Sequence, residues 1–177
     1  MLAISLWHVA DAAYLHAKAG LGQILLHRAW NETGRTGIAA KPWPWADTHP
    51  VARLVIADLD VDLLVLEGAN GRTLAWGPGH AERSAIPGSR GHAVVTGHRD
   101  THFAFLQKLE RNQRIVVTTA NRTTRAYRVE RAFVTDHRSL SLPADEDATT
   151  LSLVTCFPFD GVNPNTPLRY AVIARAE

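Results

Sequence analysis

The sequence predicts a mainly β protein: a closed eight-stranded β-barrel preceded by a long N-terminal helix, with short connecting helices. Before Pro50, apolar residues recur at helical spacing. After Pro50, they gather in short β-branched runs separated by turns rich in Gly, Asn or Asp. Eight such runs indicate a closed or nearly closed barrel. They cover residues 52–56, 61–66, 73–76, 92–96, 115–119, 126–133, 149–155 and 168–174.

The first part of the chain predicts one long helix. Apolar side chains recur near helical spacing from Leu6 to about Trp30 with no proline between them, and Gly20 and Gly22 are expected to weaken the helix. Residues 31–50 then contain several glycines and prolines, which favour an irregular segment wrapping from the helix to the core. We therefore predict two parts, an N-terminal helix and wrapping segment over 1–50 and the barrel domain over 51–177.

Two local signals are predicted between the strands. Asn70-Gly71 favours a tight hairpin turn, because both residue types tolerate positive φ. Residues 103–109 are expected to form a short helix that Thr101 could cap at its N-terminus.

Composition limits the classes of function. The 177 residues are 46% hydrophobic and can bury one core of ordinary size. The formal net charge is only +2 and no block of like charges occurs, which argues against a nucleic-acid partner. One cysteine excludes an intramolecular disulfide framework. His8, Asp11, His16 and Lys18 interrupt the first apolar stretch, so as written it neither spans a membrane nor forms a signal peptide.

Three residues at the ends of β-rich runs form a candidate catalytic set. Cys156 is the only cysteine and follows the apolar run 151–155; its alternative role is that of a small buried apolar residue. His98 follows Gly97 at the end of another run, and Arg169 lies in a third. A thiol, an imidazole and a guanidinium would supply a nucleophile, a proton carrier and a cation for a developing oxyanion.

The order and spacing of these residues resemble the sortases, cysteine transpeptidases that join secreted proteins to cell-surface acceptors. The family pattern has a Gly-His at one strand end, a Thr-Cys strand end about sixty residues later and an Arg about a dozen residues beyond, matched here by 97–98, 153–156 and Arg169. The strings most similar to the proteobacterial branch, class GN, are Gly97-His98-Arg99-Asp100-Thr101-His102-Phe103, Thr155-Cys156-Phe157-Pro158-Phe159-Asp160 and Trp43-Pro44-Trp45-Ala46-Asp47.

The resemblance implies a sortase-like barrel and a two-step reaction. Cys156 would attack a carbonyl in the C-terminal sorting signal of a secreted protein and hold that protein as a thioester, which an unidentified amine acceptor would resolve. His98 would protonate the leaving amine, and Arg169 would stabilise the oxyanion. No cofactor is expected. The resemblance further implies a membrane anchor upstream of this chain, in the inner membrane of a Gram-negative cell envelope, with the catalytic domain in the periplasm.

Further residues are predicted to contact the substrate. Thr155 precedes the nucleophile, although filling the strand is an equal alternative for it. Arg99 and Thr101 are expected at the rim beyond His98. His80 lies in a loop where the family has a substrate-flanking connection; a solvated loop histidine is its alternative. For Arg169 the alternative is a structural ion pair with Asp100 or Asp160.

A metal site is not expected from the histidines. His98 and His102 would lie one helical turn apart and His92 precedes them, but Arg99 occupies the Glu position of a His-Glu-x-x-His motif. No acidic or Cys ligand has the matching spacing. Two other functions stay open: a cysteine protease that hydrolyses the same thioester, and a noncatalytic β-barrel binding module with an incidental thiol.

Overall fold

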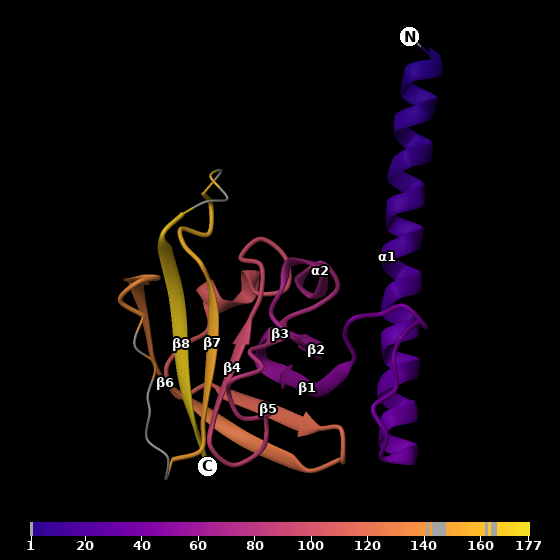
Figure 1. Cartoon of the computed structure of the whole chain (residues 1–177). Helices are drawn as coiled ribbons and strands as arrows, with labels where there is room; N and C mark the ends of the chain where they lie inside the picture. Colours follow the sequence, from indigo (N-terminus) through magenta and orange to yellow (C-terminus); the bar gives the residue numbers. More distant parts are fainter. Residues whose placement is uncertain (1, 141, 143–147, 162, 164–165) are drawn as a thin grey trace.

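The computed structural model describes residues 2–140, 142, 148–161, 163 and 166–177, and it shows a closed barrel with a long helix, α1, beside it (Figure 1). The strands follow the order β1-β2-β3-β4-β7-β8-β6-β5 around the barrel. The predicted mainly β fold, with eight strands in a closed barrel, is therefore confirmed. The strands are β1 Pro50–Ile56, β2 Val61–Glu67, β3 Gly79–His80, β4 His92–Thr96, β5 Arg114–Thr119, β6 Thr124–Asp136, β7 Thr150–Cys156 and β8 Leu168–Ala176.

The barrel interior is filled by alternate residues of its strands. On β4 and β7 the inward residues are Ala93, Val95, Leu151 and Leu153, all of which belong to the hydrophobic core. Phe103 closes part of this core and is completely buried. The period of two between core residues leaves the intervening side chains of each strand on the outer face of the barrel.

The pairing of β4 with β7 determines where the C-terminal ends of these two strands lie. β4 and β7 are parallel, whereas β7 and β8 are antiparallel. Parallel neighbours require a long crossover connection, which here contains β5 and β6. The C-terminal ends of β4 and β7 consequently lie at the same edge of the barrel wall, next to the first residues of β8.

α1 (Leu2–Thr36) packs on the outer face of the barrel through its C-terminal half. Leu26 and Trp30 form a second apolar cluster with Leu64 and Leu66 of β2. Gly22 continues the same stripe of the helix, and a Cβ added there would collide with the ring of Trp76. Gly22 therefore allows a close approach to the barrel, and the helix runs through this position without interruption.

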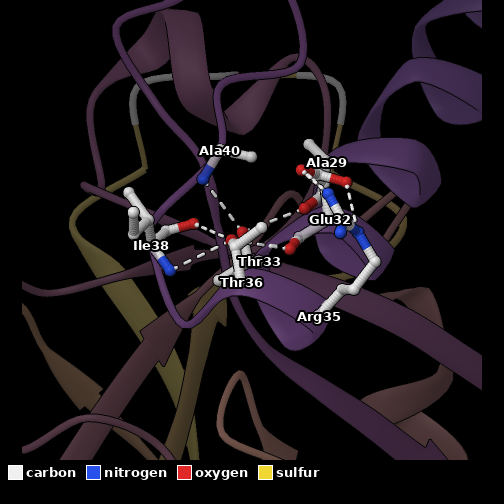
Figure 2. Close-up of polar contacts among 7 residues, drawn as sticks. All are labelled: Ala29, Glu32, Thr33, Arg35, Thr36, Ile38 and Ala40. Atoms are coloured by element: carbon white, nitrogen blue, oxygen red, sulfur yellow. Dashed lines mark hydrogen bonds and ion pairs between the residues drawn. The ribbon is translucent and has the colours of Figure 1, made fainter.

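α1 extends beyond the predicted end at Trp30, and two threonine hydroxyls make hydrogen bonds in and just after its last turns (Figure 2). Thr33 Oγ1 donates to Ala29 O and accepts from Ala40 N, both at 2.9 Å. Thr36 Oγ1 donates to the carbonyl four residues earlier at 2.9 Å. The helix stops at Gly37, whose φ of 73° is the left-handed conformation common at helix ends.

The N-terminal half of α1 projects well past the barrel (Figure 1). Tyr14, Leu21 and Ile24 are among the exposed large apolar side chains of the molecule. Among the residues that the structure describes, no helix has both the length and the apolar character needed to cross a bilayer.

The prediction of a strand over 73–76 is wrong, as is the prediction of a hairpin at Asn70-Gly71. This segment contains a short helix, α2 (Gly71–Leu74), and Asn70 is its N-cap residue. Asn70 Oδ1 accepts from the backbone N–H groups of Arg72 and Thr73 at 3.0 and 3.1 Å. Asparagine suits both a tight turn and an N-cap, so the dipeptide alone did not distinguish them. The third strand is instead the two-residue β3.

The helix predicted over 103–109 is present as a 3₁₀-helix, η2 (Ala104–Lys108). Phe103 occupies its N-cap position and no side chain caps it, so the predicted capping by Thr101 is wrong. Phe103 and Leu106 are completely buried, which indicates that core packing holds this turn in place. A second 3₁₀-helix, η1 (Ala57–Leu59), connects β1 to β2.

The two neighbouring glycines of α1 provide a matched test of this packing. Gly20→Ala, at an open position, should raise the free energy of unfolding by about 0.5–1 kcal/mol, because alanine favours the helix. Gly22→Ala should lower it by about 1–3 kcal/mol, because the added methyl must displace the Trp76 ring. Urea unfolding followed by circular dichroism measures both. A Gly22→Ala protein as stable as Gly20→Ala would contradict this account of how α1 docks.

Candidate active site

The strand register brings the ends of three strands to one place. Thr96 of β4 is paired with Val154 of β7, and Gly97 N donates to Val154 O at 3.3 Å. The parallel pairing thus continues past the end of β4, which brings His98 to the level of Cys156. On the other side of β7, Cys156 is paired directly with Arg169 of β8.

Cys156 and Arg169 form a close cross-strand pair. Phe157 N donates to Leu168 O at 3.0 Å, so this next pair along the ladder is the hydrogen-bonded one. Cys156 and Arg169 are then a non-hydrogen-bonded antiparallel pair, the type whose side chains lie closest, on one face of the sheet. Leu151 and Leu153 face the core, so Cys156 does not share the inner face of β7 with them, and its thiol is half-buried.

The guanidinium of Arg169 is held at the start of its own strand. Its Nη1 donates to Thr166 O at 2.7 Å and to Leu168 O at 2.9 Å. Within the described ranges, no carboxylate lies within ion-pair distance of Arg169, so the alternative of a structural ion pair with Asp100 or Asp160 is wrong. The Nη1 atom fixes the orientation of the group, and its Nε and Nη2 atoms donate to no residue that the structure describes.

Thr155 connects the two parallel strand ends. Its hydroxyl donates to Gly97 O at 2.7 Å, and its side chain is 3% exposed. The bond holds the backbone that carries His98 against the strand that carries Cys156. The predicted contact of Thr155 with substrate stays a prediction, and its buried side chain limits that contact to the backbone.

Arg99 and Thr101 differ in their exposure. Thr101 is exposed beyond His98, as a rim residue requires. Arg99 is not at the rim: only 9% of it is exposed, and its Nη2 donates to the carbonyls of Gly161 and Asn163. The sequence suggests a surface role for this arginine because it lies in a polar run, but burial depends on the distant segment that covers it.

His80 is a buried histidine, so the alternative of a solvated loop residue is wrong. It is 2% exposed, with Nδ1 3.1 Å from Glu67 Oε2 and Nε2 3.1 Å from Ala85 O. Both ring nitrogens therefore face protein acceptors. This arrangement links β3 to the start of the β3–β4 connection and does not favour a contact between His80 and substrate, which stays a prediction.

The histidines near the site form no metal centre in the part of the chain that the structure describes, where no group of three or more potential ligands is brought together. His92 Nε2 lies 2.7 Å from Ser152 Oγ. Burial lowers the pKa of His102, and the nearby His98 lowers it further while Asp100 opposes the change. The lowered pKa favours neutral His102 at neutral pH, so it is a poor candidate for a catalytic imidazolium.

An aromatic cluster that the sequence argument did not identify supports the chain after Cys156. The Phe157 ring stacks on the Tyr170 ring with centroids 6.3 Å apart, and Phe159 meets Tyr170 edge-on at 5.2 Å. The Phe157-Pro158-Phe159 string was a usable signal for this cluster, whereas the contribution of Tyr170 depends on the β7–β8 register. The cluster fixes the first turn after the nucleophile.

A cleft of about 690 Å³ opens beside the turn that follows β4. Thr101, His102 and Phe105 form one wall, and the turn between β1 and β2 with Asp58 and Asp60 forms another. The cleft therefore joins a partly apolar wall to exposed carboxylates close to the His98 segment.

Comparison with known proteins identifies the family. A family model for the sortase domain matches residues 54–177, which is more than half of the chain. This chain belongs to the sortase family. Sortase D of Bacillus subtilis is 30% identical over 125 residues, which are 69% of this chain and 61% of that protein. This sortase therefore spans less than two thirds of the length of that relative.

Solved sortase structures have the same fold. Sortase A from Corynebacterium diphtheriae matches with a TM-score of 0.67 and 29% identity, over 75% of this chain and 63% of that one. A Clostridium perfringens Sortase D5 transpeptidase matches with a TM-score of 0.71 over 89% of this chain and 99% of that one, and its 22% identity shows the fold alone. The predicted family is thus confirmed, and the proteobacterial branch stays a prediction.

The predicted role of Arg169 in this sortase depends on the shape of its guanidinium. Arg169→Lys should lower the rate constant for acylation of Cys156 by a peptide substrate by about 10²–10³. An ammonium cannot keep both backbone hydrogen bonds and also present a planar pair of donors to the oxyanion. Single-turnover acylation and thermal unfolding would be measured together. A rate within about threefold of wild type would assign Arg169 to structure alone.

Proposed function

We propose that this sortase is a cysteine transpeptidase that cleaves the C-terminal sorting signal of a secreted protein and transfers the protein to an amine acceptor. The observation that carries the proposal is the register that pairs Cys156 with Arg169 and sets His98 at the same level on the other side of β7. A nucleophile between a cation and an imidazole is an arrangement suited to acyl transfer.

In the first step, Cys156 Sγ attacks the carbonyl carbon of a peptide bond in the sorting signal. The carbonyl oxygen becomes an oxyanion, and the free donors of Arg169 stabilise it. When the intermediate collapses, the C–N bond breaks, and His98 donates the proton that the departing amine needs. The protein substrate is left as a thioester on Cys156.

In the second step, the amine acceptor attacks the thioester carbonyl and gives its proton to His98. The C–S bond breaks, a new amide forms, and Cys156 is regenerated with His98 protonated as at the start. The exposed position of His98 suits this alternation, because the ring must meet both a departing and an incoming amine.

We also propose that the protein belongs to the proteobacterial branch, with its catalytic domain in the periplasm and an inner-membrane anchor upstream of this chain. Support comes from the two strings around His98 and Cys156 and from the Trp-Pro-Trp segment beginning at Trp43. A genome neighbourhood encoding a secreted protein with a C-terminal sorting signal, together with a membrane span upstream in the open reading frame, would test this assignment.

The predicted nucleophile is tested by intact-protein mass spectrometry. Incubation with a panel of peptides built on Leu-Pro-x-Thr-Gly-like signals should give wild type the mass of an acyl adduct, and Cys156→Ala should give none because no other thiol is present. Cys156→Ala should unfold at nearly the wild-type temperature. An adduct on the alanine variant would refute the assignment.

Product analysis separates the proposal from its two rivals. With an excess of a glycine- or lysine-containing amine, a transpeptidase converts the acyl adduct to an amide. Release of the free acid alone, at every amine concentration, would support a cysteine protease. Absence of any adduct, together with slow alkylation of Cys156 that leaves function unchanged, would support the noncatalytic binding module.

The roles of His98 and His102 are separated by a pH series. Activity should follow a bell-shaped pH profile, because acyl transfer needs a deprotonated nucleophile and a protonated donor for the leaving amine. His98→Ala should lose at least about 10² in rate. His102→Ala should keep most activity and the same two limbs, because burial lowers the pKa of His102 and favours its neutral form. A pH profile that shifts in His102→Ala but is unchanged in His98→Ala would assign the proton-transfer role to His102 instead of His98.

A further inference from the structure

Arg99 is a buried cation immediately beside a predicted catalytic residue. Only 9% of it is exposed, although it follows the exposed His98 in the chain. Among the described residues, no carboxylate forms an ion pair with it, and its Nη1 atom is buried without a hydrogen-bond partner. Burying a guanidinium is unfavourable unless its hydrogen bonds offset the loss of hydration.

Those hydrogen bonds go to the loop that follows Cys156. Arg99 Nη2 donates to the carbonyl of Gly161 and, at 2.8 Å, to that of Asn163. Both acceptors lie between β7 and β8, and we call the described residues of this connection, 157–161, 163 and 166–167, the β7–β8 loop. A Cβ at Gly161 would lie 3.2 Å from Arg99 Nη1, so the loop backbone passes directly against the guanidinium.

The two ends of the β7–β8 loop have anchors of their own. The aromatic cluster holds its beginning. At its end, Thr166 Oγ1 donates to Phe157 O at 2.6 Å and accepts from Leu168 N at 3.2 Å. The bonds from Arg99 reach the part between these anchors, and they come from the turn that carries His98.

We propose that Arg99 is a positioning residue that joins the His98 turn to the β7–β8 loop, so that these two segments keep a fixed arrangement beside Cys156 when the sorting signal binds. The proposal rests on the proposed function. Cys156 is paired with Arg169 of β8, and β7 is paired with β4 as far as Val154, so Arg99 affects how a peptide is placed over the thiol and leaves the thiol in place.

The hydrogen bonds from Arg99 to the β7–β8 loop determine which substitutions test the proposal. Both hydrogen bonds come from one nitrogen, so Arg99→Lys can keep a charged donor for the same carbonyls. Arg99→Met retains a long unbranched side chain and removes every donor. Arg111→Met is the matched control, because Arg111 is an exposed arginine in the turn between η2 and β5.

Three measurements on the whole chain test the proposal. Arg99→Met should accelerate hydrogen exchange in peptides of the β7–β8 loop by at least about tenfold, because hydrogen bonds to a charged group are lost. It should lower kcat/KM for peptide acylation by at least about tenfold while changing Cys156 alkylation by a small neutral reagent less than about twofold. Arg99→Lys should restore much of the protection from hydrogen exchange and much of kcat/KM, and Arg111→Met should match wild type in both.

Two outcomes would overturn the proposal. One is loop exchange and acylation in Arg99→Met within about threefold of wild type. The other is a loss of alkylation rate and of protection throughout β4 and β7, which would make Arg99 a general core residue. If wild type itself forms no acyl adduct, the proposed function fails, and the exchange measurements on the Arg99 variants still decide whether the contact orders the loop.

Discussion

The parallel pairing of β4 with β7 is the constraint on which the candidate active site depends. Antiparallel neighbours would have placed the end of one strand beside the beginning of the other, whereas parallel neighbours end together. The Gly97 N–H and the Thr155 hydroxyl extend this pairing by two contacts beyond β4. β8 then adds a third strand in the opposite direction, so its first residues arrive at the same edge.

Polar contacts inside and behind this edge make it rigid. Thr155 is buried between the strand ends, and Arg99 reaches from the His98 turn to the β7–β8 loop. His80, farther along the wall, is held between Glu67 and the backbone of the next connection. Each is a buried polar group satisfied at least in part by backbone carbonyls or a carboxylate, and such groups specify one arrangement of the chain more sharply than apolar contacts do.

Much of the barrel could be predicted from the sequence because alternation of apolar residues is a local signal. Seven of the eight predicted runs overlap strands. The exception is 73–76, where Asn70 caps the short helix α2; the Asn70-Gly71 dipeptide is compatible with both a helix start and a hairpin turn. The three predicted catalytic residues followed from their residue types at the ends of β-rich runs and from the resemblance of their order and spacing to the sortases. The burial of Arg99 could not be read in this way, since its hydrogen-bond partner Asn163 is distant in the sequence. That of His80 could not either, because it depends on how Glu67 of the preceding strand and the carbonyl of Ala85 are brought around the ring.

The position of β8 has a consequence for how the candidate site is assembled. β8 lies between β7 and β6, so until it inserts, both of those strands have an unpaired edge. Without β8, the strand carrying the only thiol has an open edge and lacks its guanidinium neighbour. Closure of the barrel by β8 thus pairs both open edges and brings Arg169 beside Cys156 in one event, and an incompletely closed molecule has an exposed edge and a divided candidate site.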